Sequence, residues 1–140
     1  MFQLCYASQA NFQTEEFAVL TDILSEARQF NAAHNITGVL FFADGYFFQC
    51  LEGEEAQVRD LFARIALDSR HQQAQLLQVQ DIVTPHFQDW AMKFVGRNSQ
   101  VKQLFLSWDY MQFCPLQLSA LQLDAFLQLL YASEHHPFAA

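Results

Sequence analysis

Basic residues are scarce in this chain of 140 amino acids, which carries 7 Lys and Arg against 15 Asp and Glu, for a formal net charge of −8. Proteins that bind nucleic acid normally display a basic patch, so this balance argues against a DNA or RNA partner. It also argues against docking on anionic membranes. No apolar run approaches the roughly 20 residues of a transmembrane helix, and the first residues do not resemble a signal peptide.

Cysteine is rare as well, and the chain has no recognisable metal-ligand spacing. Cys5, Cys50 and Cys114 are odd in number and widely separated, which is typical of reduced thiols in a cytoplasm rather than of a disulfide scaffold. Three of the five histidines are equally dispersed, His135 and His136 are adjacent in a polar tail, and no His or Cys pair has the spacing of a zinc site. We therefore expect a cytoplasmic protein without a metal.

Apolar residues, in contrast, are abundant. They make up 52% of the chain, and 15 of the 140 residues are phenylalanine. This composition excludes disorder, and the length suits one domain that can bury about two thirds of its unfolded surface. We find no internal repeat and no low-complexity segment.

Hydrophobic periodicity predicts the order of the elements, because strands alternate with period two and helices repeat every 3.6 residues. The predicted elements are a strand over 2–8, a helix from a Thr14 cap to about Asn31, strands over 38–43 and 46–51 around an Asp44-Gly45 turn, a helix from 54–55 to 68–70, and strands over 75–83 and 90–95. This β-α-β-β-α-β-β order is an α+β, ferredoxin-like plan with one added strand. We expect the two helices to cover one face of a mixed sheet, with the pocket in the groove between them.

The chain changes character after Gly96. Residues 101–113 are rich in aromatic side chains, and Ser119 is a suitable cap for a last helix through Leu130. This last helix is apolar on more than one side, so it needs cover on more than one side. We expect one side to lie on the open face of the sheet, and the other to meet a partner subunit or a second protein.

Two polar residues stand out within the predicted strands. Alternation places Gln49 on the same side as Phe47 and Leu51, and an unpaired buried amide costs about 1–3 kcal/mol. Something polar must therefore lie against Gln49, although a structural glutamine bonded to nearby backbone would also satisfy it. Tyr6 lies in the middle of the first strand, where its hydroxyl needs a partner if it is buried. The alternative for Tyr6 is an ordinary core tyrosine.

Further polar residues gather where the two predicted helices end. Asn31 ends the first helix, where asparagine is common for conformational reasons alone. Arg64, Asp68, Arg70 and His71 follow one another at the end of the second helix. They suit a binding site for a phosphate or a sugar, because arginine can form bidentate hydrogen bonds with phosphate oxygens. Favourable charges at a helix terminus and an Arg–Asp pair four residues apart are the structural alternative.

Taken together, these residues resemble the BLUF domains, which are flavin-binding sensors of blue light. Five collinear blocks carry the resemblance: 4–8 (LCYAS), 31–40 (NAAHNITGVL), 44–53 (DGYFFQCLEG), 68–71 (DSRH) and 87–92 (FQDWAM). It covers residues 1–97, and the remainder resembles the two extra helices of short, stand-alone members. The resemblance therefore implies a flavin-binding domain over 1–97 and a helical extension over 98–140 for signal output and oligomer contacts.

The resemblance also implies a flavin held without a covalent bond, usually FAD, with FMN or riboflavin as alternatives. The implied ring contacts are Ile23, Leu24 and Ile65, with Asn31 on the pyrimidine edge and Gln49 between Tyr6 and the N5/O4 edge. The implied contacts on the ribityl-phosphate side are Arg64, Asp68, Arg70 and His71. Trp90 and Met92 match the switch residues of the family, although alternation alone would explain them as core residues packed with Phe94.

The family mechanism implies a light sensor without catalysis of its own. Light would draw an electron and then a proton from Tyr6 through Gln49, leave a rotated or tautomerised Gln49 amide, and shift the absorption slightly to the red. The output would pass through Trp90 or Met92 to the helices after Gly96 and on to a partner protein, and we expect a homo-oligomer. The alternatives are a small flavin oxidoreductase, for which the chain lacks a G-x-G-x-x-G nicotinamide motif, and a flavin-free ferredoxin-like interaction module. A cyclase or phosphodiesterase output would need a further domain.

Overall fold

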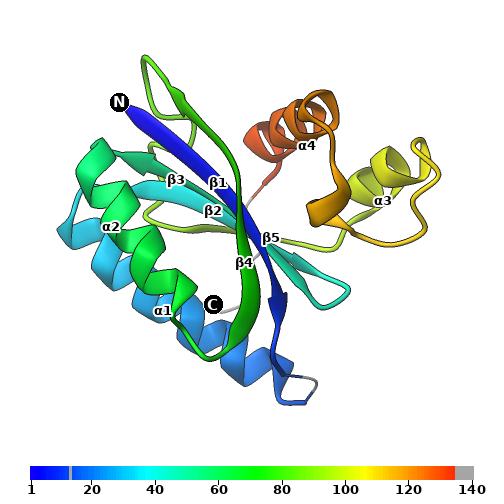
Figure 1. The fold of residues 1–140 in the computed structure, drawn as a ribbon, viewed down its shortest axis with the longest axis horizontal. Coiled ribbons are helices and arrows are strands. Elements are labelled where there is room, and N and C mark those ends of the chain that lie inside the picture. The colour runs from blue at the N-terminus through cyan, green and yellow to red at the C-terminus, as the bar shows by residue number, and fades with distance from the viewer. Residues whose placement is uncertain (13, 135–140) are drawn as a thin grey trace.

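A computed structural model of the protein describes residues 1–12 and 14–134 (Figure 1). The elements in chain order are β1 (Phe2–Ala10), α1 (Glu16–Ala33), β2 (Thr37–Ala43), β3 (Tyr46–Gly53), α2 (Glu55–Ala66), β4 (His71–Asp81), β5 (Lys93–Gly96), α3 (Ser99–Leu106), the 3₁₀ turn η1 (Pro115–Gln117) and α4 (Ala120–Ala132). This order confirms the predicted α+β plan with one added strand and two C-terminal helices. No helix in the described part of the chain is long and apolar enough to cross a membrane.

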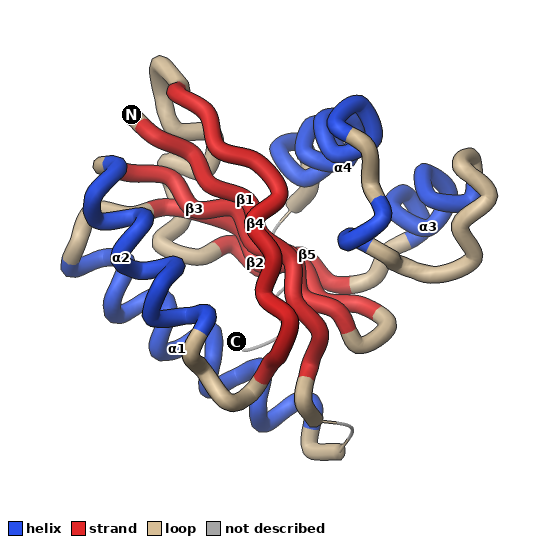
Figure 2. Tube along the Cα trace, viewed as in Figure 1, coloured by secondary structure: helices blue, strands red, loops and turns tan. Residues whose placement is uncertain are grey.

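The strands form one mixed sheet in the order β4-β1-β3-β2-β5 (Figure 2). β5 pairs in parallel with β2, and the other neighbours pair antiparallel. Helices α1 and α2 cover one face of the sheet, and α3 and α4 lie on the other side (Figure 1). The central strands β1 and β3 are therefore enclosed on both faces, as the prediction required.

Two buried clusters fill the two faces. The cavity-side core, under α1 and α2, consists of Phe2, Leu4, Tyr6, Leu20, Leu24, Ile36, Leu40, Phe42, Phe47, Leu51, Val58, Leu61, Met92 and Phe94. The extension-side core, under α3 and α4, consists of Cys5, Ala7, Val39, Phe41, Ala43, Phe48, Cys50, Phe87, Val95, Val101, Phe105, Phe113, Leu123, Phe126, Leu127 and Leu130. Alternate residues of the same strands supply both clusters, because successive side chains point to opposite faces.

The predicted Asp44-Gly45 turn is confirmed, with positive φ of 52° at Asp44 and 80° at Gly45, as a type I′ hairpin requires. The Asp44 carboxylate also accepts a hydrogen bond from the backbone N–H of Phe113 at 2.9 Å and pairs with Arg97. Gly38 is needed for a close approach, because a Cβ there would lie 2.2 Å from the carbonyl oxygen of Cys50. These contacts tie the first hairpin to the later chain.

The predicted helix termini are partly wrong. Thr14 does not cap α1: the capping position is Glu15, which has a φ of 60° and makes no side-chain cap bond. Phe17 fits the apolar repeat of α1 in the sequence, but its side chain is 62% exposed. Both helices also end elsewhere than predicted, α1 at Ala33 rather than Asn31, and α2 at Ala66 rather than at 68–70.

Two strands are displaced from their predicted bounds. β4 begins at His71 rather than at residue 75 and ends at Asp81, because its pairing with β1 continues to Ala10. β5 begins at Lys93 rather than at Trp90, so Trp90 and Met92 lie in the connection that precedes it. The expectation that Trp90, Met92 and Phe94 share one strand face is therefore wrong for Trp90, whereas Met92 and Phe94 do share the cavity-side core.

The C-terminal region covers the second face of the sheet. Ser119 caps α4 through a capping box with Gln122, as the sequence suggested, and the helix buries one face against the extension-side core. Its outward Leu121 is 85% exposed, so cover by a partner on that side stays a prediction. Residues 135–140 of the predicted extension lie outside the described residues.

Candidate functional site

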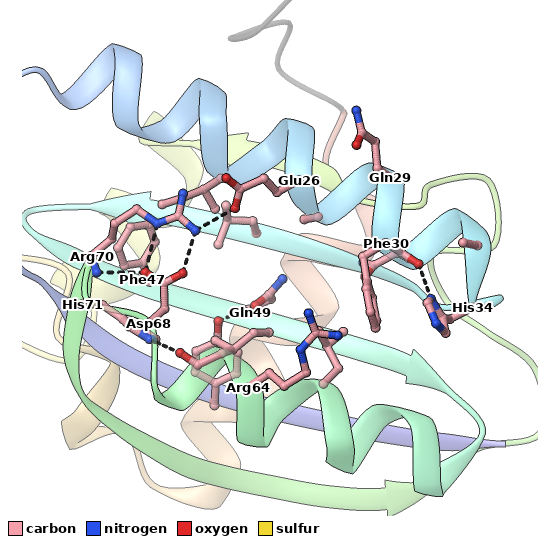
Figure 3. Close-up of a pocket in the computed structure, with 18 residues that line it drawn as sticks. Glu26, Gln29, Phe30, His34, Phe47, Gln49, Arg64, Asp68, Arg70 and His71 are labelled. Carbon is pink, nitrogen blue, oxygen red and sulfur yellow. Dashed lines mark hydrogen bonds and ion pairs between the residues drawn. The ribbon is translucent and has the colours of Figure 1, made fainter.

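A cavity of about 640 Å³ opens between α1 and α2, above the cavity-side face of the sheet (Figure 3). Nine of the ten residues expected to hold a flavin line it, namely Tyr6, Ile23, Asn31, Gln49, Arg64, Ile65, Asp68, Arg70 and His71. The tenth, Leu24, is fully buried in the cavity-side core and does not line the cavity. The groove between the two helices is thus the pocket that the element order predicted.

Gln49 lies at the floor of this cavity and is 5% exposed. It is directly opposite Tyr6 in the β1–β3 pairing, and the Tyr6 hydroxyl donates a short hydrogen bond to Gln49 Oε1. On its other side, Gln49 Nε2 donates to Met92 Sδ at 3.6 Å. The buried amide is therefore satisfied by two side chains rather than by the backbone.

The phenol of Tyr6 is protonated in this arrangement. Burial first, and the nearby negative charge of Asp68 second, hold the pKa of the Tyr6 phenol well above its usual value. The phenol therefore keeps its proton and can donate a hydrogen bond, here to the carbonyl oxygen of Gln49. In this orientation the amide nitrogen faces Met92, whose thioether sulfur is a weak acceptor.

Asn31, in the last turn of α1, carries an unsatisfied buried acceptor. Its Nδ2 donates to the carbonyl oxygen of Ala91 at 2.8 Å, whereas its Oδ1 has no partner among the described residues. Asn31 is 1% exposed and lines the cavity. Leaving such an acceptor unpaired costs about 1–3 kcal/mol, so the cavity suits a ligand with an N–H donor at this edge.

A stack of three side chains crosses one end of the cavity. The Arg64 guanidinium lies 4.7 Å from the Phe30 ring centroid, and Phe30 stacks on His34 with centroids 3.9 Å apart. Sequence reasoning did not single out Phe30 or His34 as lining residues, although their spacing of four places them on one helix face. Arg64 has no carboxylate partner among residues 1–12 and 14–134, so its charge is available to an anion.

An ion-pair cluster closes the other end (Figure 3). Arg70 donates to both carboxylate oxygens of Asp68, at 2.9 and 2.6 Å, and to Glu26 of α1 at 2.8 Å. The hydrogen bonds from Arg70 lower the pKa of Asp68, and those to Asp68 raise the pKa of Arg70. Asp68 thus pairs with Arg70 rather than with Arg64, so the Arg–Asp pair four residues apart on α2 is wrong as an explanation of this cluster.

His71 is held by the protein on both sides of its ring. Nε2 lies 2.5 Å from the carbonyl oxygen of Ile65, and Nδ1 lies 2.6 Å from the hydroxyl of Ser8. A carbonyl can only accept, so Nε2 donates to Ile65, and Nδ1 shares a hydrogen bond with the Ser8 hydroxyl. The ring is therefore fixed as part of the wall, and both of its nitrogens are engaged.

The two predicted switch residues occupy different environments. Met92 is 1% exposed, contacts Gln49, and accepts a hydrogen bond from Arg28 Nε at its carbonyl oxygen, at 3.3 Å. Trp90 is 37% exposed and does not line the cavity, and its carbonyl oxygen accepts from the backbone N–H of Gly38 at 3.2 Å. Met92 therefore contacts Gln49 directly.

These features fit a flavin. The cavity volume lies within the range of about 300–1,000 Å³ found for small-molecule sites. Asn31 Oδ1 offers the acceptor that a ring imide N–H needs, Arg64 offers a cation for phosphate oxygens, and Ile23 and Ile65 supply apolar walls.

Residues 1–93 match the family model BLUF, described as sensors of blue-light using FAD, and the chain belongs to this family. It is therefore a flavin-binding blue-light sensor. The stand-alone BLUF protein BlsA has the same fold in both of its states. In the photo-activated state it is 43% identical with a TM-score of 0.91, over 96% of this chain and 97% of that chain. In the ground state it is 43% identical with a TM-score of 0.93, over 98% and 91%.

Two curated relatives match over shorter segments. The blue light- and temperature-regulated antirepressor BluF of Escherichia coli is 38% identical over 52 residues, which are 37% of this chain and 13% of that protein. The photoactivated adenylate cyclase subunit beta of Euglena gracilis is 40% identical over 68 residues, which are 49% of this chain and 8% of that protein. The match thus spans only a small part of either relative.

Proposed function

We propose that this chain signals to a partner protein by a light-driven rearrangement of the hydrogen bonds of Gln49. The observation that carries the proposal is the Gln49 amide itself, which is buried at the cavity floor with Tyr6 on one side and Met92 on the other. An amide presents a donor and an acceptor at nearly the same positions when it is turned over. Gln49 can therefore exist in two bonding states without any large movement of the fold.

Tyr6 starts the change. When bound, a flavin supplies a chromophore that absorbs blue light and becomes a strong oxidant. Tyr6 is placed to supply the electron that this oxidant would take, and its hydroxyl proton would pass to Gln49 along the existing Tyr6–Gln49 hydrogen bond. Once the electron and the proton were back on Tyr6, Gln49 would be left rotated, tautomerised or both. In the rotated amide, Oε1 faces the sulfur of Met92, which has no proton to offer, so the Nε2–Sδ contact is lost.

The remaining side chains hold the cofactor. Asn31 would bind the pyrimidine edge through Oδ1, with Ile23 and Ile65 against the ring. Arg64 would meet the phosphate side, and the Arg70–Asp68 pair would close the other end of the groove. Leu24, in the cavity-side core, would pack behind the residues that contact the ring.

The test is an absorption spectrum before and after blue illumination. Purified protein should be yellow, and illumination should give a small red shift that decays in the dark. Tyr6→Phe keeps the ring that packs 5.1 Å from Phe62 and removes the hydroxyl, so it should keep the colour and abolish the shift. A normal photocycle in that variant would remove Tyr6 from the mechanism, and a colourless protein from flavin-rich cells would count against the whole proposal.

The wider assignment is part of the same proposal. We infer a sensor without catalysis of its own, divided into a flavin-binding unit over 1–97 and an output region over 98–140, in a cytoplasmic homo-oligomer. The names of the relatives, an antirepressor and a cyclase subunit, support output through another protein or domain. Consumption of NADH by the flavin-loaded protein would instead favour an oxidoreductase.

A further inference from the structure

The connection that carries Met92 lies between the cavity and helix α4. Met92 faces Gln49 on the cavity side. Lys93, the next residue, pairs with Val39 of β2, whose side chain belongs to the extension-side core. Successive residues point to opposite faces, so these two neighbours contact the two opposite layers of the molecule.

Lys93 is a buried cation with a helix terminus as its partner. It is 5% exposed, and its Nζ lies 3.5 Å from the carbonyl oxygen of Leu130, in the last turns of α4. The aromatic ring of Phe87 lies 5.9 Å from the same nitrogen. The C-terminal end of a helix carries partial negative charge and favours a cation. Burial lowers the pKa of Lys93.

A second set of contacts reaches the adjacent residue of α4. Gln3 Nε2 donates to the Tyr131 hydroxyl at 3.0 Å, and the His86 ring stacks on Tyr131 with centroids 4.0 Å apart and an interplanar angle of 6°. The Glu52 carboxylate accepts from the backbone N–H groups of His86 and Phe87, both at 3.0 Å. Both ends of segment 86–93 therefore contact the last turns of α4.

We propose that the last turn of α4 is loosened from the sheet when Gln49 rearranges, and that Lys93 is the positioning residue that transmits the change. The inference rests on the proposed function, because it takes the loss of the Gln49–Met92 contact as its cause. A shift of Met92 moves the backbone that it shares with Lys93. The Lys93–Leu130 distance of 3.5 Å is already at the long limit of a hydrogen bond, so a small displacement is enough to break it.

The experiment is hydrogen–deuterium exchange on the full, flavin-loaded chain, in the dark and under blue light. Light should speed exchange of the amides at residues 130–133 by at least about fivefold, the lower end of typical coupling between sites. The amides of α3 should respond less. Lys93→Met keeps the length of the side chain and removes its charge. In this variant the amides in the last turn of α4 should exchange fast in the dark, with no further increase in light. The red shift should be retained. Lys102→Met, at an exposed position of α3, is the matched control and should behave as wild type.

The outcomes separate the two proposals. A wild-type protein with no red shift contradicts the proposed function. A wild-type protein that shifts to the red without any light-dependent exchange at 130–133 overturns this inference alone, even if Lys93→Met fails to fold. A Lys93→Met protein that exchanges fast in the dark but still responds to light also overturns it, because Lys93 would then only stabilise the helix.

Discussion

The two faces of the sheet are built from alternate residues of the same strands, yet they pack differently. On the extension side, side chains from β2, β3, α3 and α4 meet ring to ring, as in the contacts of Phe126 with Phe41, Phe48 and Phe105 at 5.4, 5.0 and 5.5 Å. On the cavity side, α1 and α2 leave about 640 Å³ open between them, with the polar Gln49 and Asn31 at its boundary. One face stabilises the fold, and the other gives up part of that stabilisation to receive a ligand.

This contrast shows how a ligand site arises in a small domain. The strand pattern provides two apolar faces, and the helices decide whether a face is filled. Both sides contain buried polar side chains, but their hydrogen bonds are satisfied to different degrees. Glu52, on the extension side, accepts from four donors within the protein. Asn31, on the cavity side, keeps one acceptor without a partner among the described residues.

The largest expected effect is on the extension-side core. Phe126→Ala removes a fully buried ring, and we expect the free energy of unfolding to fall by about 3–5 kcal/mol, measured by urea denaturation. Leu121→Ala, on the same helix at 85% exposure, should change it by less than about 0.5 kcal/mol. Equal effects at the two positions would show that α4 does not pack on the sheet in solution.

The second prediction tests the hydrogen bonds of the Glu52 carboxylate on the extension side. Glu52→Gln replaces a carboxylate that accepts from Gln3, Thr37 and two backbone N–H groups, so an amide nitrogen would face donors. We expect a loss of about 1–3 kcal/mol in the free energy of unfolding. Glu55→Gln disrupts only an exposed pair with Arg59 and should cost a few tenths of a kcal/mol. A Glu52→Gln protein as stable as the Glu55→Gln protein would contradict this account of the network.

The third prediction tests the contribution of Asn31, on the cavity side, to flavin binding. Asn31→Ala removes the unpaired acceptor and the bond to Ala91. We expect flavin to bind about tenfold more weakly, equivalent to about 1.4 kcal/mol, in a fluorescence titration of the apoprotein. Asn11→Ala, whose bond to the Ser69 carbonyl is exposed, is the control and should leave affinity unchanged. Unchanged affinity in Asn31→Ala would remove Asn31 from the binding site.

The smallest effect lies at the rim of the cavity. The pKa of Asp68 is lowered in the folded protein by Arg70, so the pair stabilises the fold above the ordinary carboxyl pKa, and this contribution disappears as pH falls through about 4 and below. Because the pair is partly exposed, it should contribute less than about 1 kcal/mol. Asp68→Asn should therefore be less stable than wild type at pH 7 and approach it at pH 3, in denaturation measured at both values. A stability difference that does not change with pH would contradict the pairing.

Local pattern was sufficient for much of the fold and for where Gln49 lies. Strict alternation placed Gln49 with Phe47 and Leu51, and the structure puts all three side chains on the cavity side. The Asp44-Gly45 turn was readable because its backbone conformation needs those residue types. The residue roles toward the flavin came from the family resemblance, and they remain proposals.

Longer-range contacts explain what the pattern missed. Trp90 fits a strand by alternation, but the pairing with β2 begins only at Lys93. The carbonyl oxygens of Ala91 and Met92 accept instead from the side chains of Asn31 and Arg28, which belong to α1. Phe30 was missed because its cation–π partner Arg64 is on another helix. The orphan oxygen of Asn31 could not be inferred at all, since it depends on which atoms happen to surround it.

The contacts of Asp44 limit how the first part of this chain can be joined to another protein. One carboxylate in the first hairpin binds both Arg97 and the backbone of Phe113, and the helices beyond it cover Phe41 and Phe48. A chain cut after residue 97 would expose those two rings to water, and the Asp44 carboxylate would keep Arg97 but lose the backbone N–H of Phe113. Joining residues 1–97 to another protein therefore requires the recipient to supply side chains that cover this face of the sheet.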